Sequence, residues 1–214
     1  MHIELDSDRL FTAIKTVAHA VVNSPTTPIL ENVLLRVTNE KMVVVANNLE
    51  MAIEYTIDSD IVVHDPGDIT ISFRFLASYL NLLDPTRLTI KTDTGHTLHL
   101  TANKNKMHHK GLSAEEFPMI PATRRDTRFV LSSDILRRAF SKTLFSCASG
   151  NIRPTLAGVY IQLHPDHVTF ASTDSFRLSE YRYNCDTGVD KKIAIILPFR
   201  SANEIMKTLP EWID

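Results

Sequence analysis

Short runs of alternating apolar and polar residues, interrupted by runs with helical spacing, dominate the first half of the chain. Apolar residues at a period of two are typical of strands with one buried face, whereas apolar residues three and four apart are typical of amphipathic helices. The alternating runs predict strands around Ile3 and Leu5, and over 32–38, 41–47, 51–57, 69–71, 87–92, 97–102 and 105–110. Helical spacing relates Leu10, Ile14 and Val17, and again Leu76, Leu80 and Leu83. The predicted order is strand, helix and three strands, given twice.

This pattern repeats along the chain. A shift of 126 residues places Leu10 on Leu136 and Phe73-Arg74 on Phe199-Arg200. A weaker shift of 66 residues places Ile3, Leu5, Leu10, Ile14 and Val17 on Ile69, Ile71, Leu76, Leu80 and Leu83. Because a repeat at a fixed period indicates a duplicated structural unit, we predict copies of one unit. For the 66-residue shift alone, chance similarity between short strand-helix segments is the alternative.

The predicted elements favour an α+β fold in which helices cover one face of antiparallel sheets. The longer repeat divides the chain into a first domain over 1–126 and a second domain over 127–214. The second copy has only 214 − 126 = 88 residues, so it lacks counterparts of the predicted strands over 87–110. A sheet without those strands would have unpaired edges, so we expect a truncated chain or one that another polypeptide completes.

Composition narrows the class of protein. With 214 residues, 43% of them hydrophobic and 22% charged, the chain is long enough for one large or two small globular domains. Its net charge of −2 means that any contact with nucleic acid is local. Residues 1–126 carry 12 Lys and Arg against 16 Asp and Glu, a net of −4, whereas residues 127–214 carry 11 against 9, a net of +2.

The chain shows no export or membrane signal. Its amino terminus, MHIE, lacks the basic and apolar segments of a secretory signal, and no apolar run is long enough to cross a bilayer. Cys147 and Cys185 form no Cys-x-x-Cys pair. We therefore expect a cytoplasmic protein with reduced thiols that does not enter a membrane.

Four stretches resemble segments of the bacterial DNA polymerase sliding clamps, the beta subunits of DNA polymerase III. They are SPTTPILENVLL at 24–35, GLSAEEFP at 111–118, RPTLAGV at 153–159 and STDSFRL at 172–178. Each stretch is weak alone, but in this order they extend over essentially the whole chain. The resemblance implies the DNA clamp fold, with this chain supplying domain one and most of domain two of the three in that family.

The resemblance also implies a function. Members of the family close as two chains, head to tail, into a ring around duplex DNA, and they perform no chemistry and need no cofactor. We therefore expect a processivity factor that binds DNA without sequence preference and forms a homodimer when full length. Its expected partners are DNA polymerase, the clamp loader and repair proteins, which the family binds through short peptide motifs.

A sliding ring needs basic residues that attract phosphates without reading bases. The candidates on or beside the predicted helices are Arg9, Lys15, Arg74, Arg137, Arg138, Lys142, Arg200 and Lys207. Arg74 and Arg200 are the strongest candidates for contacts with phosphate, because they occupy equivalent repeat positions and match basic positions of the family. Arg153 matches a family arginine near DNA, whereas Ser24 stands where many relatives have arginine. The alternative for Arg138 and Lys142, four residues apart, is a solvated helix face.

The resemblance further implies an apolar groove that receives the peptide tails of partners. The residues that match its wall in the second domain are Leu156, Thr173, Ser175, Phe176, Arg177 and Leu178. A leucine or aromatic side chain of the peptide would bury apolar area there, and Arg177 would fix the peptide. Phe176 replaces a residue that is often polar in relatives. The alternative is that Leu156, Phe176 and Leu178 are strand core residues.

Two other classes of protein compete with a clamp. A small hydrolase or transferase could use Asp174, but no histidine lies near it in sequence, so we interpret it as a turn carboxylate and predict no catalytic residue. A metal site is suggested by two pairs of histidines, His96 with His99 and His108 with His109. Their spacings of three and one put the two members of each pair on opposite faces of a strand, so we expect no metal site. A scaffold that kept the clamp fold without encircling DNA is the third possibility.

Overall fold

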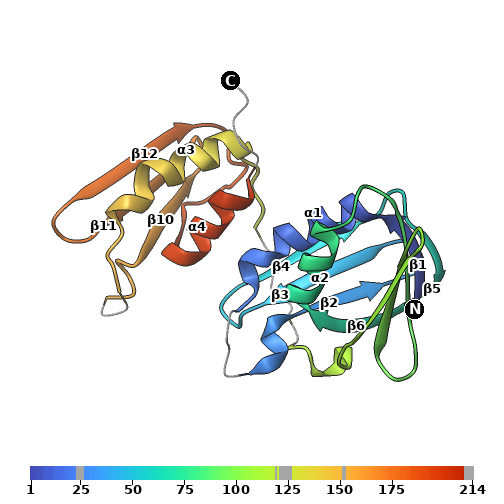
Figure 1. Ribbon diagram of the computed structural model, residues 1–214. Coiled ribbons are helices and arrows are strands. Elements are labelled where there is room, and N and C mark those ends of the chain that lie inside the picture. Colours follow the sequence, from blue (N-terminus) through green and yellow to red (C-terminus); the bar gives the residue numbers. More distant parts are fainter. Residues whose placement is uncertain (23–26, 119, 121–126, 151–152, 210–214) are drawn as a thin grey trace. The chain divides into compact units, whose positions relative to one another are not determined.

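The chain divides into two compact units, Met1–Pro121 and Ala122–Asp214. This computed structural model describes all residues except 23–26, 119, 121–126, 151–152 and 210–214. The expected domain boundary at residue 126 falls outside the described residues and stays a prediction. Each unit combines helices with antiparallel sheets (Figure 1), so the predicted α+β class is confirmed.

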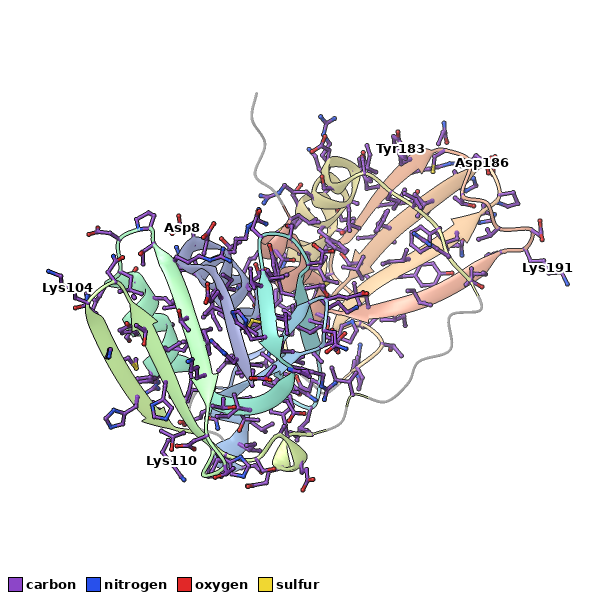
Figure 2. The ribbon with its side chains drawn as sticks, turned by 90° about the vertical axis from the view of Figure 1, so that its right-hand side faces the viewer. Asp8, Lys104, Lys110, Tyr183, Asp186 and Lys191 are labelled. Atoms are coloured by element: carbon purple, nitrogen blue, oxygen red, sulfur yellow. The ribbon has the colours of Figure 1, made fainter. Side chains whose placement is uncertain are left out.

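Unit 1 contains two antiparallel sheets and two α-helices. Its strands are β1 (His2–Asp6), β2 (Asn32–Val37), β3 (Met42–Asn47), β4 (Ala52–Ile57), β5 (Val62–Asp65), β6 (Gly67–Ser72), β7 (Arg87–Thr92), β8 (Thr97–Ala102) and β9 (Asn105–Lys110). Its helices are α1 (Ser7–Val17) and α2 (Phe73–Asn81). The strand orders are β5-β1-β7-β8-β9 and β4-β3-β2-β6. Figure 2 shows Lys104 and Lys110 at opposite ends of the edge strand β9. The short edge strand β5 was not predicted.

Each sheet of unit 1 takes one strand from the other half of the unit. β1 pairs with β7, with Leu5 opposite Leu88, and β6 pairs with β2, with Ile71 opposite Val33. The two segments related by the 66-residue shift, β1-α1-β2-β3-β4 and β6-α2-β7-β8-β9, are therefore interlocked. Their apolar side chains form one core between the helices and both sheets. The weaker repeat is thus a structural repeat and not a chance similarity.

Strands β2 and β3 are covered on both faces, so the prediction of a single covered face is wrong for them. Leu35 and Val44 face the main core, whereas Leu34 and Val45 belong to a second apolar cluster on the opposite face. That cluster also contains Phe117, which follows the short helix η3 (Ala114–Glu116) and is only 5% exposed. The sequence pattern missed this cover because short 3₁₀ segments carry no periodic signal.

Gly111 allows the chain to leave β9 directly against β6. A Cβ atom at this position would lie 2.3 Å from the carbonyl oxygen of Thr70, so only glycine fits without a shift. The next residue, Leu112, exchanges two backbone hydrogen bonds of 3.1 Å with Thr70. The stretch that resembles the family's connector is therefore fixed to unit 1 from its first residue.

Unit 2 repeats these elements at the predicted period. It contains α3 (Ser133–Thr143), β10 (Gly158–His164), β11 (His167–Thr173), β12 (Leu178–Asn184), β13 (Ile193–Pro198) and α4 (Phe199–Thr208), with strand order β12-β11-β10-β13. Adding 126 to the bounds of α1 gives those of α3, and the same sum carries the start of α2 to that of α4. The repeat is confirmed. None of the helices in the described residues is long and apolar enough to cross a bilayer.

The segment that corresponds to β1 is not a strand in unit 2. Adding 126 to 2–6 gives 128–132, which the structure describes without regular secondary structure. Val130 is 76% and Phe129 36% exposed, whereas Ile3, the counterpart of Phe129, is fully buried. In unit 1 this strand pairs with β7, whose counterpart would begin at 87 + 126 = 213. The described part of unit 2 therefore has a single sheet.

We expect backbone amides of residues 128–132 to exchange at least about 100-fold faster than those of β1, because β1 is paired on both sides, whereas 128–132 pair with no strand of the described chain. Hydrogen exchange followed by mass spectrometry on the 214-residue chain measures both segments at once. Protected amides in β10 and β13 would show that unit 2 is folded. Equal protection of the two segments would contradict the assignment.

Candidate functional site

Arg74 and Arg200 occupy the same position in the two repeats, the second residue of α2 and of α4, and both are exposed. The side chain of Ser72 accepts a hydrogen bond from the backbone N–H of Phe75, which caps α2 just before Arg74. A cation in the first turn of a helix is disfavoured by the helix dipole, typically by about 0.3–1 kcal/mol. The helix dipole therefore does not favour either arginine at its position.

The three basic residues of α3 are placed differently from one another. Arg137 is half-buried and donates a hydrogen bond from Nη2 to the carbonyl oxygen of Leu209 at 2.7 Å, so it ties α3 to the end of α4. Arg138 and Lys142 are exposed on the surface of α3. Arg137 therefore has part of its hydrogen-bonding capacity committed within the unit.

Three other basic helix residues also have intramolecular contacts. Arg9 of α1 forms an ion pair with Asp60, and Lys207 of α4 pairs with Glu204 at 2.8 Å. Lys15 lies 4.0 Å from the ring centroid of Phe11. Because exposed ion pairs contribute only about 0–1 kcal/mol, these partners do not prevent a contact with phosphate. Ser24 lies outside the described residues.

A tight turn between β11 and β12 gathers four of the predicted groove residues. Asp174 Oδ1 accepts hydrogen bonds from the backbone N–H groups of Phe176 and Arg177, both at 3.0 Å, and Asp174 Oδ2 pairs with Arg177 Nε at 2.9 Å. Thr173 Oγ1 donates to the carbonyl oxygen of Arg177 at 2.7 Å and accepts from the N–H of Ser175 at 3.1 Å. Ser175 adopts a left-handed backbone, with φ of 79°. The side chains therefore hold a turn that serine does not favour.

The environment of Asp174 supports its interpretation as a turn carboxylate. The backbone N–H of Phe176, and then that of Arg177, lower the pKa of Asp174 below its ordinary value, so the carboxylate is charged at neutral pH. Both of its oxygens are engaged by these groups and by the Arg177 guanidinium. A nucleophile or general base needs a free lone pair directed at a substrate, so the hydrolase or transferase hypothesis loses its main residue.

Arg153 connects the two kinds of predicted site. It was singled out as a DNA contact, and its Nη1 donates a hydrogen bond to Ser175 Oγ, a predicted groove residue, at 3.2 Å. Leu156 is half-buried just before β10, and the register that sets Tyr160 opposite Ala171 brings the start of β10 beside the end of β11. The predicted groove residues thus lie at one end of the sheet of unit 2.

Three large apolar side chains are exposed on unit 2 at or near this turn. Phe176 is 98% exposed, Leu178 71% and Phe145 57%, so the alternative that Phe176 and Leu178 are core residues is wrong. The guanidinium carbon of Arg177 lies 5.9 Å from the ring centroid of Phe145, within the range of a cation–π contact. Phe145 was not predicted from the sequence, because it lies in the 3₁₀ segment η4 (Leu144–Ser146) and outside the strand pattern. Exposed apolar side chains grouped around polar ones mark an interaction surface.

The histidines singled out from the sequence are dispersed. His109 stacks on Phe75 with ring centroids 3.7 Å apart, whereas the adjacent His108 lies opposite His99 across β8 and β9, with centroids 6.3 Å apart. The expectation that His108 and His109 occupy opposite faces is confirmed. His96 lies in the turn before β8 with φ of 56°, so the expectation that His96 and His99 occupy opposite faces of one strand is wrong. In neither pair, His96 with His99 or His108 with His109, do the two side chains converge on one point.

Repeated units of helices on antiparallel sheets are the architecture of the clamp fold. The family model described as DNA polymerase III beta subunit, N-terminal domain, matches residues 1–121, and the model of its central domain matches residues 130–212. The chain belongs to the DNA polymerase III beta subunit family.

Curated relatives and solved structures agree with this assignment. The chain is 24% identical over 217 residues to the beta sliding clamp of Bacillus subtilis and 26% identical over 221 residues to that of Streptococcus pneumoniae. These matches cover 99% and 100% of this chain, and 57% and 58% of the relatives. The crystal structure of the Bacillus subtilis sliding clamp superposes with a TM-score of 0.93 at 22% identity, covering 99% of this chain and 57% of that one. The chain thus spans a little over half the length of its relatives.

Replacing Asp174 by Ala should loosen the turn, because the amides of Phe176 and Arg177 lose their acceptor and Arg177 loses its ion pair. We expect exchange of these two amides to accelerate roughly fivefold, since one hydrogen bond contributes about 1 kcal/mol net. Hydrogen exchange by NMR measures the effect. Asp174→Asn keeps an acceptor oxygen and should give a smaller acceleration. Unchanged exchange in Asp174→Ala would show that other contacts hold the turn.

Proposed function

We propose that this chain is part of a sliding clamp, which encircles duplex DNA as a head-to-tail ring and keeps the replicative DNA polymerase attached to it. The observation that carries the proposal is the equivalent placement of Arg74 and Arg200 in the first turns of α2 and α4. The family match over both units supports it. Because the chain spans 57% of its Bacillus subtilis relative, the ring belongs to a longer polypeptide or assembly.

Weak binding to DNA is consistent with this role. A net charge of −2 gives the chain no general attraction for a polyanion. Arginines on helix surfaces contact phosphates, which are the same at every step of the duplex, so such contacts neither select a sequence nor prevent sliding. The stability of the complex then comes from ring closure. The proposal places the protein in the cytoplasm with the DNA, and it assigns the protein no catalysis.

Retention on circular DNA tests encirclement. A chain completed with the remaining part of the Bacillus subtilis relative is loaded by a clamp loader onto nicked circles, which are then isolated by gel filtration before and after linearisation. We expect the completed chain to be a dimer that stays on circles and leaves linear DNA through its ends. Equal loss from circles and linear DNA would replace the clamp with a scaffold that does not encircle DNA.

Replacing both Arg74 and Arg200 by Glu in the completed chain should reduce loading at least about tenfold, because two attractions for phosphate become repulsions. The matched control is Lys106→Glu with Arg182→Glu, which makes the same charge change. Lys106 and Arg182 are exposed, and their strand neighbours Met107 and Tyr181 pack toward the cores. They therefore lie on the sheet faces opposite the helices. Equal loss of loading in both double variants would remove the assignment of the helix arginines.

We also propose that the turn over 173–178, with Phe145, binds short apolar peptides of DNA polymerase, the clamp loader and repair proteins. The exposed Phe176 and Leu178 offer apolar area, and Arg177 and Arg153 offer donors beside it. This is the chemistry of a peptide anchored by a leucine or aromatic side chain. Leu156 and Thr173 lie at the same end of the sheet and complete the predicted set.

Replacing Phe176 by Asp in the completed chain should weaken a leucine-containing clamp-binding peptide at least about tenfold, because a charge replaces an apolar contact. Isothermal titration calorimetry measures the affinity. The matched control is Leu82→Asp, which introduces the same charge at a leucine of unit 1 that is 84% exposed. Phe176→Leu should retain most of the affinity. Wild-type affinity in Phe176→Asp would place the peptide elsewhere.

A further inference from the structure

Three side chains of types that can bind a metal ion converge on the outer face of the five-stranded sheet of unit 1. β1 buries Ile3 and Leu5 completely in the core, so His2 and Glu4 lie on the opposite face, where both are half-buried. The third side chain, His64, comes from the edge strand β5, which lies beside β1 next to the amino terminus (Figure 1). These three residues are named here the His2–Glu4–His64 cluster, and Glu4 and His64 are 60 positions apart in sequence.

A β-bulge directs His64 toward the other two residues. β5 pairs with β1 so that Val63 lies opposite Ile3 and Asp65 lies opposite His2, with a shift of register between these pairs. His64 is therefore the extra residue that has no partner on β1. An extra residue of this kind bends the strand and changes the direction of its side chain. The register shift between β1 and β5 brings the three residues of the cluster together, and no sequence pattern predicts it.

The geometry of the cluster is close to that of a metal site. The rings of His2 and His64 stack with centroids 4.3 Å apart, and His64 Nε2 lies 3.3 Å from Glu4 Oε1. One possible ligand atom from each residue lies within 4.8 Å of the others. Ligands at about 2.1 Å from a tetrahedral ion are roughly 3.4 Å apart, so the three side chains must draw together and the two stacked rings must turn so that one nitrogen of each faces the ion.

We propose that His2, Glu4 and His64 bind a divalent transition-metal ion of the zinc class, with water as the fourth ligand. Two imidazoles and one carboxylate are ligands that Zn²⁺ accepts in tetrahedral sites. The bound ion joins β5, an edge strand of four residues, to the central strand β1.

The same sheet contains a matched control. His99 lies 3.3 Å from Asp93 and opposite His108, so it also has a carboxylate and a second imidazole as neighbours. The rings of His99 and His108 are 6.3 Å apart and tilted, and these residues do not form a converging group in the described chain. The His2–Glu4–His64 cluster and the group of Asp93, His99 and His108 have similar residue types and exposure. Only in the His2–Glu4–His64 cluster do the possible ligand atoms come close to one another.

Titration of Zn²⁺ into the 214-residue chain, produced without a polyhistidine tag, tests the proposal by calorimetry. We expect one Zn²⁺ per chain. His64→Ala and Glu4→Gln should each weaken binding at least about tenfold, whereas His99→Ala should bind as the wild type does. Absence of binding, wild-type affinity in His64→Ala, or equal weakening in His99→Ala would each overturn the site.

Two further measurements separate loss of the site from loss of folding. The visible absorption of bound Co²⁺ should have the intensity of a tetrahedral complex and should disappear in Glu4→Gln. Zn²⁺ should raise the unfolding temperature of the wild-type chain and of His99→Ala but not that of His64→Ala. Without Zn²⁺ the three proteins should unfold at similar temperatures, because these side chains lie outside the core. Stabilisation of His64→Ala by Zn²⁺ would contradict the assignment.

Discussion

Burial of the apolar faces of the helices against antiparallel sheets is the interaction on which the rest of the structure depends. In unit 1 the core includes Leu10 and Ile14 from α1, Leu76 from α2, and alternate residues of both sheets, and each fully buried aliphatic side chain contributes about 1.5–3 kcal/mol. Neither half of the unit can complete a sheet alone, because β1 belongs with β7 and β6 belongs with β2. Because each half contributes one strand to the sheet of the other, both copies of the repeated segment are needed to form the two sheets.

This packing determines which residues are left for function. Because Leu76 faces the core, Arg74 lies on the solvent side of the first turn of α2, and the 126-residue repeat places Arg200 likewise on α4. The sheet ends are determined in the same way. The register of β10, β11 and β12 brings together the turn of Asp174 and the segment before β10, where Arg153 contacts Ser175. The proposed DNA-facing surface and the proposed peptide-binding surface are therefore both consequences of one repeated core.

The sequence predicted most of the fold because the strands alternate and the helices keep a regular apolar face. The repeat then placed Arg74 and Arg200 without any structural information. The sequence pattern did not predict strand β5, the apolar cluster that covers the outer face of β2 and β3, or the exposed Phe145. These features depend on short segments that show no hydrophobic periodicity. The His2–Glu4–His64 cluster was missed for a different reason. Its members are joined by a register shift between two strands, and sequence spacing reports only neighbours on one strand.

Site-specific photo-crosslinking tests the central claim, that equivalent positions of the repeated units face the same DNA. A photoreactive amino acid replaces Arg74, Arg200 or, as a control on the opposite sheet face, Lys106 in the completed chain loaded on nicked circular DNA. We predict crosslinks of similar yield from positions 74 and 200, distributed over the DNA without sequence preference, and little from position 106. Crosslinks from position 106 alone, or from one of the two repeat positions only, would contradict the account.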